Sequence, residues 1–316
     1  MNRSISKWGV LADEDLKKIH ETAVTLLADT GLKISGESGR SLVLDHGGRE
    51  TANGHLSLPA PLVEKAIAGN RPFSLYGAGS AGDMDLLSGR SYVHNFGTSA
   101  FILDSETGQK RPATLADLIA SVKLLDKMDS CHMIHQLVTP TELDAALEQP
   151  IGNAVLLLNT DKPVVLGAST GREARWAVET VKAAHGGPEG LKRCRAALSY
   201  SPISPLIFNE DTMDMLAASA NSGVPVLFMS CPMLGVTAPM SMAGGLVLQH
   251  MENLGALTLL RLMDPEAKFI YGGRLSVADM RNGLHRDGHP DKGLFGAAAI
   301  PTRACSERRP RGWPIW

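Results

Sequence analysis

Apolar residues recur at intervals of three and four positions through residues 12–30, and this period predicts an amphipathic helix. Leu16, Ile19 and Ala23 fall on its apolar face, and Gly31 follows as a stop signal. The other elements predicted ahead of residue 111 are two helices and two short strands, at 38–45, 59–67, 73–76 and 91–96. This mixture predicts an α+β region over residues 1–111.

After residue 112, short apolar runs alternate with helix-like segments. The runs end near Thr139, Ser169, Ser204, Ser230 and Gly272. The helix-like segments cover 142–159, 172–184, 211–222, 244–263 and 290–300. The runs are continuously apolar, which is typical of strands that are covered on both faces. Alternation of such strands with helices predicts a parallel sheet.

Two architectures contain such a sheet, the open doubly wound fold and the (β/α)₈ barrel. In the alternating region no GxGxxG motif follows the first strand, so the nucleotide-binding version of the open fold lacks its main signal. Small polar residues at the strand ends favour a barrel, although serine and threonine are also ordinary helix caps. A full barrel has eight strands, whereas five apolar runs are found. The predicted fold is therefore α/β, an incomplete TIM barrel of about five βα units over residues 112–300.

The segment 301–316 differs from everything before it. It contains four arginines, three prolines, two tryptophans and a single glutamate, with no helical or alternating pattern. We interpret it as an aberrant basic tail of a truncated or frameshifted product. An incomplete sheet exposes strand edges that favour pairing with other chains, so a homo-oligomer or a poorly folding fragment are both among the expectations.

Charge and cysteine content narrow the class of protein. The formal net charge of −2 favours neither nucleic acid nor an anionic membrane as a partner. No apolar run follows the basic residues near the N-terminus, and the longest apolar stretches have the length of a strand, so neither a signal peptide nor a membrane span is predicted. Four widely separated cysteines indicate reduced thiols and a cytoplasmic location.

The densest group of candidate ligand-binding residues lies at 92–98. Asn95 and Thr98 are polar, and they flank Phe96 and the flexible Gly97, a composition suited to a loop that grips a small ligand. The alternative is a hairpin whose polar side chains satisfy its own turn. No Ser-His-Asp set, carboxylate pair or metal-ligand spacing is found, so no catalytic residue and no metal site is predicted.

Several stretches, in this order along the chain, resemble the trimethylamine methyltransferase (MttB-like) family. They are HETAVTLLADTGLKI (20–34), LPAPLVEKAI (58–67), FSLYG (73–77), YVHNFGTSAFILDSETGQKRPATLADL (92–118), NTDKPVV (159–165) and IYGGRLSVADMRNG (270–283). The resemblance implies a TIM barrel that follows a mixed N-terminal region. Family members are longer, and the late segment in which some carry pyrrolysine would lie beyond residue 300.

The resemblance also implies a reaction, in which a methyl group passes from trimethylamine, glycine betaine or a similar amine to cobalt(I). The cobalt belongs to a corrinoid on a separate partner protein, so no cofactor is expected to bind this chain directly. A quaternary ammonium group is recognised by aromatic faces, and from residue type we assign Phe96, Phe228 and Tyr271 to such a cage. Asn95 and Thr98 are expected to donate hydrogen bonds to a substrate carboxylate. The alternatives are a non-catalytic binder of betaine-like amines and a non-functional fragment.

Overall fold

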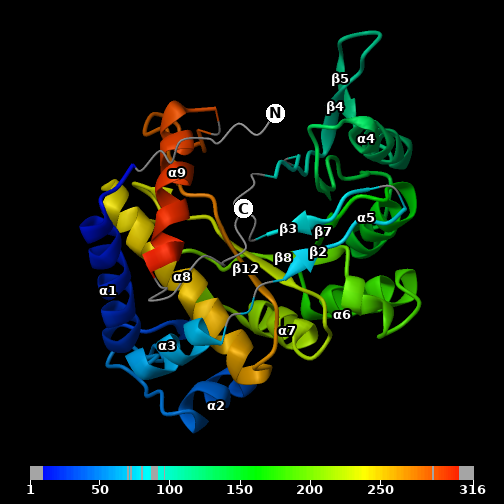
Figure 1. Cartoon of the computed structure of the whole chain (residues 1–316). Coiled ribbons are helices and arrows are strands. Elements are labelled where there is room, and N and C mark those ends of the chain that lie inside the picture. Colours follow the sequence, from blue (N-terminus) through cyan, green and yellow to red (C-terminus); the bar gives the residue numbers. More distant parts are fainter. Residues whose placement is uncertain are drawn as a thin grey trace. The chain divides into compact units, whose positions relative to one another are not determined.

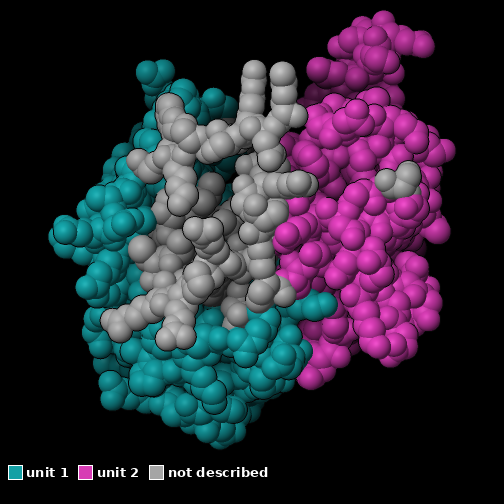
Figure 2. Space-filling model, in the orientation of Figure 1, with its two compact units in different colours: residues 1–71, 201–213, 228–316 teal, residues 72–200, 214–227 magenta. Residues whose placement is uncertain are grey.

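The computed structural model describes residues 10–69, 71, 73–79, 81–86, 92–95, 97–286 and 288–305, with the backbone alone for 299–305. The chain forms two compact units that interleave along the sequence (Figure 2). Unit 1 comprises residues 1–71, 201–213 and 228–316, and unit 2 comprises 72–200 and 214–227. The division of the sequence at 111 and 300 stays a prediction.

The five apolar runs form five strands of one parallel sheet, as predicted. In sheet order these are β12 (Phe269–Gly273), β10 (Val226–Ser230), β8 (Ala196–Tyr200), β7 (Val164–Gly167) and β6 (Ile134–His135). Among these five, each strand lies beside the one that precedes it in chain order, and Val164 of β7 pairs with both Ile134 and Ala196. The α/β class is therefore confirmed, and the described residues form an open sheet and no closed ring.

Unit 1 is built around α8 (Met242–Met263), with α1 (Asp13–Asp29), α3 (Ala60–Ala68) and α9 (Pro290–Cys305) packed against it (Figure 1). Its other elements are α2 (Glu37–Asp45) and two parallel strand pairs, β1 (Lys33–Ile34) with β9 (Ile207–Phe208) and β11 (Met233–Leu234) with β13 (Ser276–Val277). Every residue of α8 from 248 to 261 is buried. Within the described part of the chain, no helix combines the length and apolar character that crossing a membrane requires.

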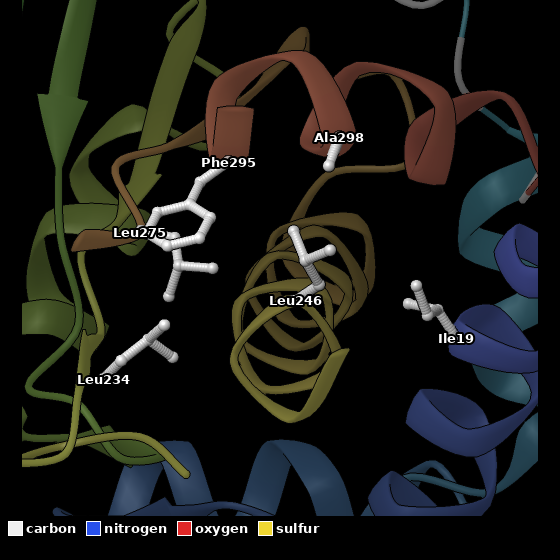
Figure 3. Packing of buried hydrophobic residues seen from close by; sticks show 6 residues of the cluster. All are labelled: Ile19, Leu234, Leu246, Leu275, Phe295 and Ala298. Atoms are coloured by element: carbon white, nitrogen blue, oxygen red, sulfur yellow. The ribbon is translucent and has the colours of Figure 1, made fainter. Parts of the chain in front are cut away.

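An apolar cluster joins the helices of unit 1 (Figure 3). Ile19 of α1, Leu246 of α8 and Phe295 of α9 meet there with Leu234, Leu275 and Ala298. All six are at most 5% exposed. Full burial of one leucine, isoleucine or phenylalanine contributes about 1.5–3 kcal/mol, so this cluster is a main source of cohesion between α8 and its neighbours.

Unit 2 contains α4 (Leu115–Lys127), α5 (Ala145–Asn159), α6 (Gly171–Ala184), the 3₁₀ turn at Gly190–Arg193 and part of α7 (Glu210–Ser219). Two antiparallel hairpins complete it, β2 (Ser74–Leu75) with β3 (Met84–Asp85) and β4 (Phe101–Leu103) with β5 (Lys110–Pro112). Helix α4 was not predicted. Its start is a capping box in which the Asp117 N–H donates to the Thr114 hydroxyl and the Thr114 N–H donates to the Asp117 carboxylate.

The predicted strand at 91–96 is wrong in its described part, which holds only an isolated bridge at His94 to Met133. The side chain of Asn95 takes the place of the expected strand pairing. The Asn95 amide donates to the His135 carbonyl at 2.8 Å and accepts from the His135 N–H at 2.8 Å. A side-chain amide thus makes the two hydrogen bonds that a backbone peptide would make in a strand.

Candidate active site at the carboxyl ends of the strands

In unit 1 the carboxyl ends of β10 and β12 lie together. Cys231 follows β10 directly and Arg274 follows β12 directly, and the Arg274 N–H donates to the Ser230 carbonyl at 2.8 Å. Two residues further on, the Ser276 N–H donates to the Pro232 carbonyl at 3.1 Å. Proteins with parallel sheets bind ligands at this edge, because loops that follow neighbouring strands converge there.

Glu252 of α8 brings a fully buried carboxyl group to this edge. It accepts hydrogen bonds from the Ser204 hydroxyl at 2.9 Å, from the Leu206 N–H at 2.9 Å and from the Ser230 hydroxyl. Burial raises the pKa of Glu252, and the three donors partly offset that rise. The carboxyl therefore joins the loop after β8 to the end of β10, and it is the kind of buried acid that active sites employ.

Three basic side chains gather at the same edge. Burial lowers the pKa of Arg274, and it also lowers the pKa of Lys292, where the positive charge of Arg274 adds to the effect. The pKa of His285 is lowered by burial and then by Lys292 and Arg274. The charge of Arg274 acts on both Lys292 and His285, so the three groups lie in the same region. The end of β12 thus carries a cationic cluster, defined here as Arg274 and Lys292, and the lowered pKa leaves His285 beside it mainly neutral at neutral pH.

The Cys231 thiol adjoins the cationic cluster. Burial raises its pKa, and the charge of Arg274 opposes that rise. A thiol with a raised pKa is mainly protonated at neutral pH, so it is a weak nucleophile. Cys231 is best described as part of the lining of this edge.

Asn95, Gly97 and Thr98 of the predicted ligand-binding loop belong to unit 2. Asn95 is held by His135, as described above, and Thr98 is exposed. A Cβ atom on Gly97 would lie 1.9 Å from the Gln136 carbonyl oxygen, so only glycine fits this approach of two backbones. Phe96 lies outside the described residues. The part these four residues play in ligand binding stays a prediction.

The two aromatic residues assigned to a cage in unit 1 have buried positions. Phe228 is fully buried and stacks with Phe208 and with Phe269, at ring-centroid distances of 5.8 and 6.2 Å. Tyr271 is 1% exposed, and its hydroxyl lies 2.8 Å from Nδ1 of His250 in α8. Phe228 also shares its side of β10 with Ser230, which contacts Glu252 of α8. These contacts are those of the helix-facing core, and contact with substrate stays a prediction for both residues.

The residues that sequence reasoning missed are polar groups inside α8. The pattern at 244–263 predicts a helix but does not distinguish Gln249, His250, Glu252 and Asn253, and all four are at most 1% exposed. A cluster of polar residues in an otherwise apolar helix was the available signal, since buried polar groups need specific partners.

Two other candidate sites have fewer features that indicate ligand binding or catalysis. A pocket of about 190 Å³ in unit 1 is lined by Ala28, Gly47, Arg49, Ser57, Pro59 and Ala60, of which only Arg49 is charged. In unit 2, Gly77, Gly79 and Gly82 have the GxGxxG spacing, but they lead from β2 into the antiparallel β3 and not into a helix, so the dinucleotide-binding context is missing. Among the residues that the structure describes, no three His, Cys, Asp or Glu side chains are placed to hold one metal ion.

Comparison with solved structures supports the fold. The chain is similar to the crystal structure of the Methanosarcina barkeri monomethylamine methyltransferase (MtmB), with a TM-score of 0.54 and 13% sequence identity. The match covers 92% of this chain and 65% of that one. At this level of identity the likeness concerns the fold alone.

Comparison with known sequences extends over most of the chain. This chain is 29% identical over 290 residues to the trimethylamine methyltransferase MttB of Desulfitobacterium hafniense strain DCB-2. The match covers 90% of this chain and 58% of that protein. The chain is 26% identical over 303 residues to the glycine betaine methyltransferase of D. hafniense strain Y51, covering 95% and 63%. The chain thus spans about three fifths of the length of these relatives. The family model described as trimethylamine methyltransferase (MTTB) matches residues 1–300, and the chain therefore belongs to this family.

Proposed function

We propose that this protein transfers a methyl group from a tertiary or quaternary amine to the cobalt(I) of a corrinoid carried by a separate protein. The observation that carries the proposal is the match of the trimethylamine methyltransferase family model over residues 1–300. Two relatives are named for trimethylamine and for glycine betaine, and these names indicate methylated amines as the substrate class. The chain spans less than two thirds of the length of those relatives, so their activity is a proposal for this chain.

We further propose that the five-stranded sheet is part of a (β/α) barrel. Successive strands of the five-stranded sheet lie next to each other, and a helix lies between the two strands of every pair, which is the local arrangement of such a barrel. The likeness to MtmB over 92% of this chain supports the same architecture. A barrel would direct the carboxyl ends of its strands to one face, where barrel enzymes carry out their chemistry.

The cationic cluster favours a methylated amine that also bears a carboxylate. Arg274 and Lys292 place positive charge at the ends of β10 and β12. A carboxylate such as that of glycine betaine would be attracted there, and an arginine can bind it with two parallel hydrogen bonds. A simple trimethylammonium ion would be repelled by the same charges. We therefore place betaine-like substrates ahead of trimethylamine.

The proposed reaction requires few reactive side chains. The corrinoid, when present on its partner, supplies cobalt(I) as the nucleophile that accepts the methyl group. The protein has to hold the substrate so that one N-methyl group is presented to the cobalt, and to exclude water. Arg274 and Lys292 would orient the substrate by its carboxylate, and the Glu252 network would keep the surrounding loop in place.

The test is methyl transfer to cob(I)alamin, supplied free in solution as a substitute for the partner's corrinoid. The purified protein is offered glycine betaine, carnitine or trimethylamine, and methylcobalamin is followed by its absorbance. We expect product from at least one carboxylated amine and less from trimethylamine. Binding of betaine in calorimetry without any methylcobalamin would favour a non-catalytic binder instead. Absence of both binding and turnover would contradict the proposed function.

A further inference from the structure

Four polar side chains of unit 1 form a continuous chain of hydrogen bonds from the surface to the core. Glu64 of α3 is the outer end, with its side chain 54% exposed, and Tyr271 of β12 is the inner end, at 1%. His20 of α1 and His250 of α8 lie between them. The separations are 3.3 Å from Glu64 Oε1 to His20 Nε2, 3.0 Å from His20 Nδ1 to His250 Nε2, and 2.8 Å from His250 Nδ1 to the Tyr271 hydroxyl.

The chemistry of the groups fixes the direction of each hydrogen bond. An ionised carboxylate only accepts, so Nε2 of His20 carries a hydrogen and donates to Glu64. A neutral imidazole has one donor and one acceptor, so Nδ1 of His20 accepts from Nε2 of His250. Nδ1 of His250 must then accept from the Tyr271 hydroxyl. All three hydrogens point from the core toward the surface, and both histidines are in the Nε2–H form.

We propose that this chain is a proton relay between solvent at Glu64 and the buried Tyr271 hydroxyl. In the outward direction the Tyr271 O–H bond breaks and an N–H bond forms at Nδ1 of His250. The Nε2–H bond of His250 breaks as one forms at Nδ1 of His20, and the Nε2–H bond of His20 breaks as one forms on Glu64. Tyr271 is left as a phenolate, Glu64 as a carboxylic acid that releases its proton to water, and both imidazoles stay neutral in the opposite tautomer.

The geometry distinguishes a relay from an ordinary satisfied core. A histidine can instead be satisfied by a nearby backbone carbonyl, as the partly buried His185, which follows α6, is by Val181. Here each of the four groups comes from a different element, and every inner bond joins side chains that can both give and take a proton. His250 is fully buried, so water does not reach it in the folded state. The relay is independent of the proposed function, because it concerns proton movement whatever reaction the protein catalyses.

The assignment of tautomers is tested by nitrogen NMR of the protein labelled in histidine, with His20→Gln and His250→Gln used to identify the signals. We expect both residues to be protonated at Nε2 and unprotonated at Nδ1 near neutral pH, and a scalar coupling between Nε2 of His250 and Nδ1 of His20 across their hydrogen bond. A His250 protonated at Nδ1, or absence of the coupling, would overturn the proposal.

Proton movement is tested by the exchange of the His250 Nε2 hydrogen with water. If the relay conducts, this hydrogen exchanges faster than the backbone amide of Met251, which only opening of α8 exposes. Glu64→Gln keeps an oxygen that accepts from His20 but cannot take up a proton, so we expect exchange to slow by about tenfold or more. Glu21→Gln, on the exposed surface of α1, is the matched control and should leave the rate unchanged. Equal rates for His250 and the Met251 amide, or no effect of Glu64→Gln, would refute conduction.

Discussion

The Glu252 carboxylate accepts a hydrogen bond from the Leu206 backbone N–H at 2.9 Å, which joins the buried helix α8 to the loop that follows β8. Ser204 and Ser230 complete the same network. Replacement by alanine would leave these donors buried without an acceptor. We expect Glu252→Ala to lower the free energy of unfolding by about 3–5 kcal/mol, as measured by urea denaturation. A loss below about 1 kcal/mol would show that the network is not important for stability.

The same carboxyl predicts a pH dependence. Burial raises the pKa of Glu252 in the folded state above its unfolded value. Its contribution to stability is therefore complete below the unfolded pKa and is lost as the pH rises through the folded pKa. The difference in unfolding free energy between the wild type and Glu252→Gln should accordingly shrink as the pH rises above about 4.3. A difference that grows with pH over this range would reverse the assignment.

Asp117 predicts the opposite dependence for the start of α4. Hydrogen bonds from Arg111, and then from Thr114, hold the pKa of Asp117 well below its usual range. This contribution is present above the unfolded pKa and is lost as the pH falls through the folded value. At neutral pH, Asp117→Asn should therefore speed hydrogen exchange of the first-turn amides of α4. Asp129→Asn, on the exposed loop after α4, is the control and should have no effect.

Gly97 tests the close approach of two backbones in unit 2. A Cβ atom there would meet the Gln136 carbonyl, so Gly97→Ala must displace main chain and should cost about 1–3 kcal/mol. Gly82→Ala is a matched control in the same unit, because a Cβ atom on Gly82 would have nothing within 4 Å. Thermal denaturation of the two variants compares them directly. Equal melting temperatures would show that the loop at 97 is displaced at little cost.

The cationic cluster predicts a selective loss of substrate binding. Arg274→Gln removes the charge that we propose orients a carboxylate, so we expect the KM for glycine betaine to rise at least about tenfold. Turnover of trimethylamine, which has no carboxylate, should not fall. Arg193→Gln is the control, since Arg193 pairs with Asp83 on the surface of unit 2. Equal effects of Arg274→Gln on both amines would mean that Arg274 supports the fold and not the choice of substrate.

The parallel sheet and most helices of this chain could be predicted because their signals are local. Continuous apolar runs marked all five strands, and the helical period marked α1 and α8 within a few residues. Helix α4 was missed although Leu118 and Val122 have helical spacing. Its capping box at Thr114 directly follows a strand-rich segment without a helical pattern, and this hid the start of the helix.

The polar interior of unit 1 could not be predicted in the same way. His20 and His250 are 230 positions apart, and no local sequence pattern indicates that they form a hydrogen bond in the folded chain. From the sequence, Glu252 would be expected at the exposed surface of its helix, because the packing of α1, α3 and α9 that covers α8 cannot be seen in the local pattern. For the same reason Phe228 and Tyr271, assigned by residue type, have contacts in the core that their positions in the sequence did not reveal.

We propose that this member of the family moves a methyl group from an amine to cobalt. The most direct measurement is carbon NMR of a reaction between the purified protein, cob(I)alamin and glycine betaine labelled in its methyl groups. We expect a methyl–cobalt signal that appears together with an equal amount of labelled dimethylglycine. Betaine that remains intact, while the protein is folded and the cobalt stays reduced, would contradict it.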